Sequence, residues 1–220
     1  MLFGEIIEPS TRAFCDDDPQ YLENYRCDLV WDVDQVPETI DNLFVAESTR
    51  ITTLFHKCLL QNANKYAELT PGYVRIYQAK NDYIVLICNV SDIIPGLVVE
   101  ALSRWLKSAN SVYVITSGLL TSLQNSRASS PCVIRSLCYK TTSTYPKLEV
   151  PNMVTGLSAS VLSYCIHIDR SCSLYIGFFD EASLDSLNTY ALLNLLETFG
   201  LRLHKRYEFE NSNQSNNLYI

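Results

Sequence analysis

The pattern of apolar and polar positions along this chain changes repeatedly between the spacing of strands and that of helices. Short strands are expected at 28–33 and 42–46, separated by a turn that contains Pro37. A helix is expected next, because apolar residues recur at i, i+3, i+4, i+7 and i+8 after a capping Ser48 or Thr49. These apolar positions are Ile51, Leu54, Phe55, Cys58 and Leu59.

The middle of the chain predicts a hairpin followed by a second helix. Residues 73–78 and 83–90 have the pattern of two strands joined by a turn at 80–82. The run 84–87 is continuously apolar, as expected for a central strand that is covered on both faces. Pro95 is expected to open the helix that follows, because proline favours the first helical turn.

The last part of the chain continues the alternation. The expected elements are strand 111–116, exposed loop 124–130, strand 132–139, helix 158–167, strand 173–179 and helix 184–199, which Gly200 ends. This order favours one α/β domain at 1–209, a single layered domain with a central β-sheet flanked by helices. Residues 210–220 are too polar to pack, so we expect a flexible C-terminal tail there.

The amino-acid composition and charge of the chain argue against some classes of binding partner. Hydrophobic residues make up 47% of the 220 residues and charged residues 19%, which is typical of a globular chain. The net charge of -7 argues against nucleic acid, which needs a concentrated basic face. The first residues carry no basic region typical of a signal peptide, and no apolar run approaches the roughly 18 residues of a membrane span. We therefore expect a chain of the cytosol or nucleus with no membrane partner.

Candidate catalytic and metal-binding chemistry is sparse. The eight cysteines include no C-x-x-C pair, so we expect core residues and no metal. His56, His167 and His204 are widely separated, and none has a partner that would make it a general base. No glycine-rich phosphate loop is present, so we expect no cofactor and no enzyme. A small-molecule enzyme on a doubly wound sheet remains an alternative, by analogy of fold alone.

The end of the tail indicates protein binding. A polar stretch leads to Leu218, Tyr219 and Ile220, although such a linker has no folding reason to end in apolar residues. Leu218 can fill an apolar slot, Tyr219 offers a ring with a hydroxyl, and the Ile220 carboxylate can pair with a lysine. The same ending also fits a generic adaptor whose terminus is captured by a PDZ domain.

Three segments resemble a known family, that of proteasome assembly chaperone 1. Residues 1–7, MLFGEII, resemble its F-G-E-hydrophobic opening, and residues 151–165, PNMVTGLSASVLSYC, match its P-N-hydrophobic-V-x-x-L-x-A-x-V-L-S-Y-C segment. The endings at 214–216 and 218–219 match as well. The strong similarity covers about a third of the chain.

The resemblance implies a non-catalytic chaperone with protein partners. Such a chain pairs with a homologous subunit, assembly chaperone 2, and the heterodimer binds the proteasome α-ring during assembly of the 20S core particle. Leu218, Tyr219 and Ile220 would then form a hydrophobic-Tyr-X motif that enters a pocket between α-subunits, where a lysine takes the carboxylate. We interpret 151–165 as part of the fold and of the heterodimer structure. Its core residues are expected to be Val154, Leu157, Val161 and Leu162, after a turn at Pro151 and Asn152.

Overall fold

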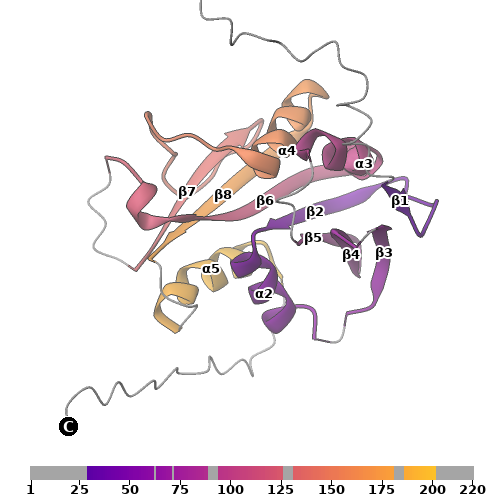
Figure 1. The fold of residues 1–220 in the computed structure, drawn as a ribbon, viewed down its shortest axis with the longest axis horizontal. Helices are drawn as coiled ribbons and strands as arrows, with labels where there is room; N and C mark the ends of the chain where they lie inside the picture. The colour runs from indigo at the N-terminus through magenta and orange to yellow at the C-terminus, as the bar shows by residue number, and fades with distance from the viewer. Residues whose placement is uncertain are drawn as a thin grey trace, which may run out of the picture.

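Eight strands form one mixed sheet in the computed structural model, which describes residues 29–61, 63–70, 72–88, 94–125, 131–180 and 186–201 (Figure 1). The strands are β1 (Val30–Trp31), β2 (Ile40–Glu47), β3 (Lys65–Thr70), β4 (Val74–Ala79), β5 (Asp82–Ile87), β6 (Ala109–Leu119), β7 (Cys132–Tyr139) and β8 (Ser171–Phe179). Across the sheet they lie in the order β1-β3-β4-β5-β2-β6-β8-β7. The central strands β5, β2, β6 and β8 run parallel, and the pairs towards both edges are antiparallel.

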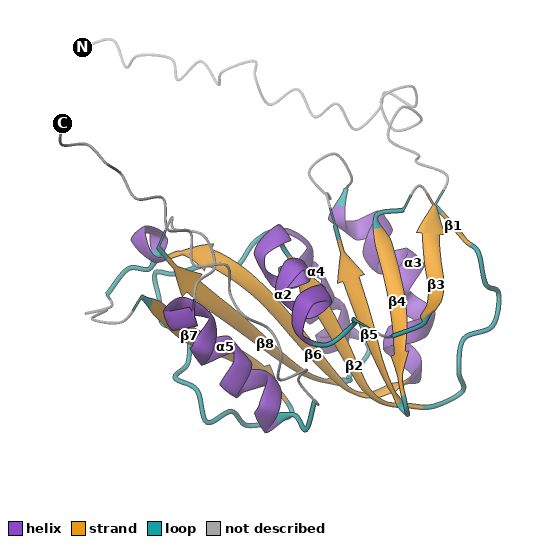
Figure 2. Ribbon diagram, turned by 90° about the horizontal axis from the view of Figure 1, so that it is seen from below, coloured by secondary structure: helices purple, strands orange, loops and turns teal. Residues whose placement is uncertain are grey.

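Helices cover both faces of this sheet (Figures 1 and 2). The described helices are α2 (Thr49–Cys58), α3 (Pro95–Ser108), α4 (Gly156–His167) and α5 (Ser186–Thr198), with a short 3-10 turn, η3, at Leu120–Ser122. Side chains of β2 alternate between two cores: Leu43 and Val45 pack in the core with α3 and α4, whereas Phe44 and Ala46 pack in the core with α2 and α5. The expected α/β domain, with a central sheet between helical layers, is confirmed.

Most predicted elements are present with shifted ends. The continuously apolar run 84–87 is buried in β5, which lies between β4 and β2 as expected for a central strand. Strand β3 was not predicted, since its inward positions offer only Ala67 and Leu69 as buried apolar residues. Of the strand expected at 28–33, the described residues 29–33 form only β1. At Asp32 the backbone N–H still donates to the Glu68 carbonyl at 3.0 Å, but the Asp32 carboxylate, instead of a strand carbonyl, accepts the Glu68 N–H at 2.6 Å.

The cysteines are mostly core residues, as expected. Those at 58, 132, 165 and 172 are buried and Cys88 is half-buried, whereas Cys15 and Cys27 lie outside the described residues. Cys138 is exposed, so the expectation was wrong there. Cys138 is the next-to-last residue of the edge strand β7. The core does not extend to this end of the strand, so the side chain is not covered.

Candidate protein-interaction face

The predicted binding residues Leu218, Tyr219 and Ile220 lie outside the described residues. A site on the folded body is indicated instead by Val150 and Met153. Their side chains are 86% and 85% exposed, the highest values among the large apolar residues that the structure describes. Both belong to the connection between β7 and α4. Large apolar side chains exposed together often mark a surface that another protein covers.

Asn152 holds these two residues in a fixed turn. Its backbone N–H donates to the Glu149 carbonyl at 3.0 Å, and its side chain accepts the Gln124 N–H at 2.7 Å. The Asn152 amide nitrogen donates to the carbonyls of Gln124 and Glu149, at 3.0 and 2.8 Å. The turn expected at Pro151 and Asn152 is therefore confirmed, with a cis peptide between Val150 and Pro151. A turn that is ordered before binding loses less conformational entropy when a partner docks.

Glu47 fixes the start of α4, which follows this turn. Its carboxylate accepts hydrogen bonds from the Ser158 backbone N–H at 2.9 Å, from the Ser158 hydroxyl, and from the Thr116 hydroxyl at 3.5 Å. A carboxylate is favourable there, since the first N–H groups of a helix have no partner within it and carry partial positive charge. The last residue of β2 thus connects the centre of the sheet to α4.

Polar side chains gather at the carboxyl ends of β2 and β6, where open α/β sheets often bind ligands. Ser48, in the left-handed region at φ 83°, caps α2 by accepting the Ile51 N–H at 3.4 Å, as predicted. The Ser117 hydroxyl lies 2.7 Å from that of Ser48. The hydrogen bonds of Glu47 and Ser48 connect the ends of β2 and β6 to the first turns of α2 and α4.

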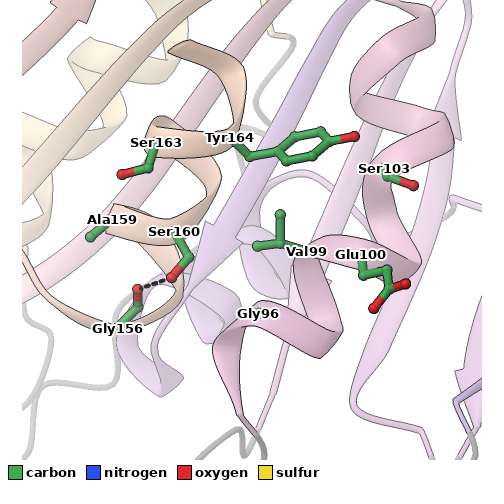
Figure 3. A pocket seen from close by; sticks show the side chains of 9 residues that line it. All are labelled: Gly96, Val99, Glu100, Ser103, Gly156, Ala159, Ser160, Ser163 and Tyr164. Atoms are coloured by element: carbon green, nitrogen blue, oxygen red, sulfur yellow. Dashed lines mark hydrogen bonds between the residues drawn. The ribbon is translucent and has the colours of Figure 1, made fainter. Parts of the chain in front are cut away.

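A groove of about 700 Å³ runs between α3 and α4 (Figure 3). Small residues form much of its α4 wall, and Tyr164 reaches from α4 towards α3. Its lining residues on α4 are Gly156, Ala159, Ser160, Ser163 and Tyr164. Among the described residues that line it, Glu100 of α3 alone has a charged side chain, and α4 contains no Asp, Glu, Lys or Arg.

We define the α4 face as Val150 and Met153 of the turn with Ala159, Ser163 and Ile166 of the helix that follows it; Ile166 is 45% exposed. The three helix residues are spaced at i, i+4 and i+7, so they share one side of α4. A solvent-facing helix usually carries charged residues, whereas the cores of protein interfaces are depleted in them and enriched in methionine. The α4 face therefore has the composition of a protein-binding surface.

The expected core residues of the segment 151–165 lie where they were predicted. Leu157 and Val161 are 1% and 0% exposed, and the half-buried Val154 and Leu162 pack against the same core. Met153 was not among the predicted binding residues, although it is an apolar residue between Asn152 and the helix. Its exposure depends on the turn geometry, which the residue pattern does not specify.

Two of the three histidines considered as candidate bases lie within the described residues, on different helices. His56 lies on α2 with its ring edge-on to Tyr77, and its pKa is lowered by burial and by the charge of Arg75. His167 ends α4 beside the ring of Tyr164, and His204 lies outside the described residues. Within the described ranges, no helix is long and apolar enough to cross a bilayer, and His, Cys, Asp and Glu form no group of three suited to a metal ion.

No protein-family model matches the sequence. A comparison with curated proteins finds a relative. Mouse proteasome assembly chaperone 1 is 29% identical over 147 residues, which are 60% of this chain and 50% of the mouse protein. The chain thus spans about half the length of the curated relative it matches.

Solved structures share the fold. Pyrococcus furiosus PbaA, described as an archaeal homolog of proteasome-assembly chaperone, has a TM-score of 0.58 at 12% identity, covering 80% of this chain and 83% of PbaA. P. furiosus PbaB, described as an archaeal proteasome activator, has a TM-score of 0.56 at 10% identity, covering 80% and 91%. A protein of unknown function from Corynebacterium glutamicum reaches 0.60 at 11%, covering 80% and 83%. At these identities the likeness shows the fold alone. With the mouse match, it supports the resemblance to proteasome assembly chaperones found in the sequence.

Proposed function

We propose that this chain is a proteasome assembly chaperone, which pairs with a homologous assembly chaperone 2 subunit and binds the α-ring of the 20S core particle during assembly. The observation that carries the proposal is the match over 147 residues to mouse proteasome assembly chaperone 1. The fold shared with an archaeal homolog of such a chaperone supports it. The function is binding rather than catalysis, and it is carried out in the cytosol or nucleus.

We assign the α4 face to the homologous subunit. The most specific part of the family resemblance, 151–165, runs through this face, and its outward residues carry no charge. Val150 and Met153 are held by the hydrogen bonds of Asn152 before any partner arrives. The matching surface should be apolar and uncharged, because an unpaired charge buried against this face would be costly.

Leu218, Tyr219 and Ile220 are assigned to the α-ring. Burying the leucine gives about 1.5–3 kcal/mol, and a charge-assisted bond from the Ile220 carboxylate to a lysine gives about 1.5–3 kcal/mol. Ordering the linker opposes both contributions. The motif therefore binds weakly alone, and the folded heterodimer must supply a second contact.

Binding of the purified heterodimer to α-rings tests the motif. Replacing Tyr219 by Ala, or deleting 218–220, should weaken α-ring binding about tenfold to a hundredfold and leave heterodimer formation unchanged. Asn216→Ala in the adjoining linker is the matched control and should have no effect. If Tyr219→Ala were harmless while deletion abolished binding, the motif would be acting as a PDZ-type ligand, which depends on alternate residues. Unchanged α-ring binding after deletion would remove the assigned role.

A further inference from the structure

The groove between α3 and α4 continues the α4 face, because Ala159 and Ser163 belong to both. Its α3 wall consists of Gly96, Val99, Glu100 and Ser103. An apolar cavity of roughly 150 Å³ holds a benzene ring. The groove, at about 700 Å³, therefore has room for several side chains of a partner that covers the α4 face.

Glu100 brings a carboxylate to this groove without a cation beside it. Figure 3 shows its side chain on α3, across the groove from the small residues of α4. Arg104 follows it by one helical turn, the spacing at which an i,i+4 ion pair forms. In the described part of the chain, however, Glu100 makes no ion pair, with Arg104 or with any other residue. The side chain is exposed, so water solvates the carboxylate as long as the groove is open.

A partner that covers the groove takes this carboxylate out of water. Burying a charge without a counter-charge is costly, whereas a well-placed opposite charge offsets much of that cost. The occupant must therefore bring one lysine or arginine to Glu100, and small or apolar side chains to the uncharged walls. A second copy of the chain does not meet this requirement through its own α4, which contains no Lys or Arg.

We propose that a segment of the homologous subunit fills the groove between α3 and α4 and places one lysine or arginine against Glu100. The inference rests on the proposed function, which supplies this partner, and it adds the chemistry by which the partner is selected. Glu100 favours the homologous subunit and disfavours a second copy of this chain, since specificity is the difference between two affinities. The α4 face supplies uncharged contact area, and the single ion pair fixes the register.

Charge variants of Glu100 test the ion pair. Isothermal titration calorimetry of the two purified subunits should show pairing at least about tenfold weaker for Glu100→Gln, and weaker still for Glu100→Lys. The cation of the partner would face no charge in the first variant and a like charge in the second. Glu197→Gln is the matched control, an exposed glutamate on α5 over the other face of the sheet, and should pair normally. Equal affinities of Glu100→Gln and the unmodified chain would overturn the proposal.

Charge reversal distinguishes an ion pair from a structural role of Glu100. With Glu100→Lys in this chain, each lysine and arginine of the homologous subunit is replaced by glutamate in turn. One replacement should strengthen pairing with Glu100→Lys at least about tenfold and weaken pairing with the unmodified chain. If no replacement does so, Glu100 meets no cation of that subunit and the proposal is wrong.

Gly96→Leu tests whether the groove is occupied. Among the described residues, a Cβ at Gly96 would meet no atom within 4 Å, so a leucine fits the free chain and takes up space in the groove. Pairing should weaken at least about tenfold with Tm not lowered, and Thr198→Leu, at an exposed position of α5, should have no effect. Unchanged pairing would place the partner elsewhere. Self-association that Gly96→Leu abolishes would place a second copy in the groove, and either result overturns the proposal.

Pairing of the unmodified subunits separates failure of this inference from failure of the proposed function. If they pair and the Glu100 and Gly96 variants pair equally well, the chaperone function stands and the homologous subunit does not use the groove. If the unmodified subunits do not pair at all, the proposed function is rejected, and the occupant assigned to the groove is rejected with it.

Discussion

The carboxylate of Glu47 accepts hydrogen bonds from both the backbone N–H and the hydroxyl of Ser158, which lies 111 positions later in the chain. The first residue ends a central strand, and the second lies in the opening turn of α4. This contact sets where α4, and with it the α4 face, begins.

Glu47→Ala should destabilise the fold. The substitution leaves the N–H and hydroxyl of the 1% exposed Ser158 without their acceptor, so we expect the free energy of unfolding to fall by about 2–3 kcal/mol. Urea unfolding followed by circular dichroism measures it. Asp41→Ala, an exposed acid on the same strand, is the matched control and should change stability by less than about 0.5 kcal/mol. Equal effects of the two variants would show that Glu47 does not anchor α4.

Asn152→Ala should loosen the turn that presents Val150 and Met153. Three side-chain hydrogen bonds are lost, and we expect weaker pairing with the homologous subunit, by about tenfold. Isothermal titration calorimetry of the two purified subunits measures this. Gln124 takes part through its backbone, so Gln124→Ala should pair normally. Asn152→Ala with unchanged affinity would mean that the turn does not need to be ordered before binding.

The layered fold was predictable because it depends on short-range patterns. The apolar run 84–87 specified a strand buried on both faces, and the Ser48 cap and Gly200 marked helix ends that the structure places there. The Glu47–Ser158 contact was not predictable, since nothing in the local sequence of either residue refers to the other. Strand β3 was missed because its two buried apolar residues form too short a pattern.

Met153→Asp should block pairing with the homologous subunit and spare the fold. The side chain is 85% exposed, so a charge there costs little in the free chain, but it would be desolvated under a partner. We expect a loss of affinity of at least about tenfold with Tm unchanged. Tyr190→Asp is the matched control: Tyr190 is 66% exposed on α5, over the opposite face of the sheet. If Tyr190→Asp abolished pairing and Met153→Asp did not, the partner would bind the α2 and α5 layer.

Cysteine reactivity should follow burial. Burial raises the pKa of Cys58 to about 11, against a smaller opposing effect of Lys57, and that of Cys132 to about 12, with Asp180 adding to the rise. Only about one Cys58 thiol in a thousand is then ionised at pH 8, and the thiolate is the reactive form. Among the described cysteines, we expect iodoacetamide to modify the exposed Cys138 first, as read by peptide mass spectrometry. Labelling of Cys132 at the rate of Cys138 in the native chain would contradict this.

The functional residues were less predictable from the sequence than the fold was. Leu218, Tyr219 and Ile220 stand out in sequence because apolar residues follow a polar stretch, and their role remains a proposal. The α4 face was visible only as the segment 151–165, since the exposure of Val150 and Met153 arises from the turn that Asn152 makes with Gln124. A residue pattern predicts which side chains face a core, but not which apolar side chains a turn holds away from it.

Affinity purification of the full chain from its own cells, with mass spectrometry of what is retained, tests the assembly-chaperone function most directly. We expect two sets of partners: a homologous assembly chaperone subunit and 20S α-subunits, with mature β-subunits depleted. The chain lacking 218–220 should keep the homologous subunit and lose most α-subunits. Recovery of neither set by the full chain would contradict the proposed function.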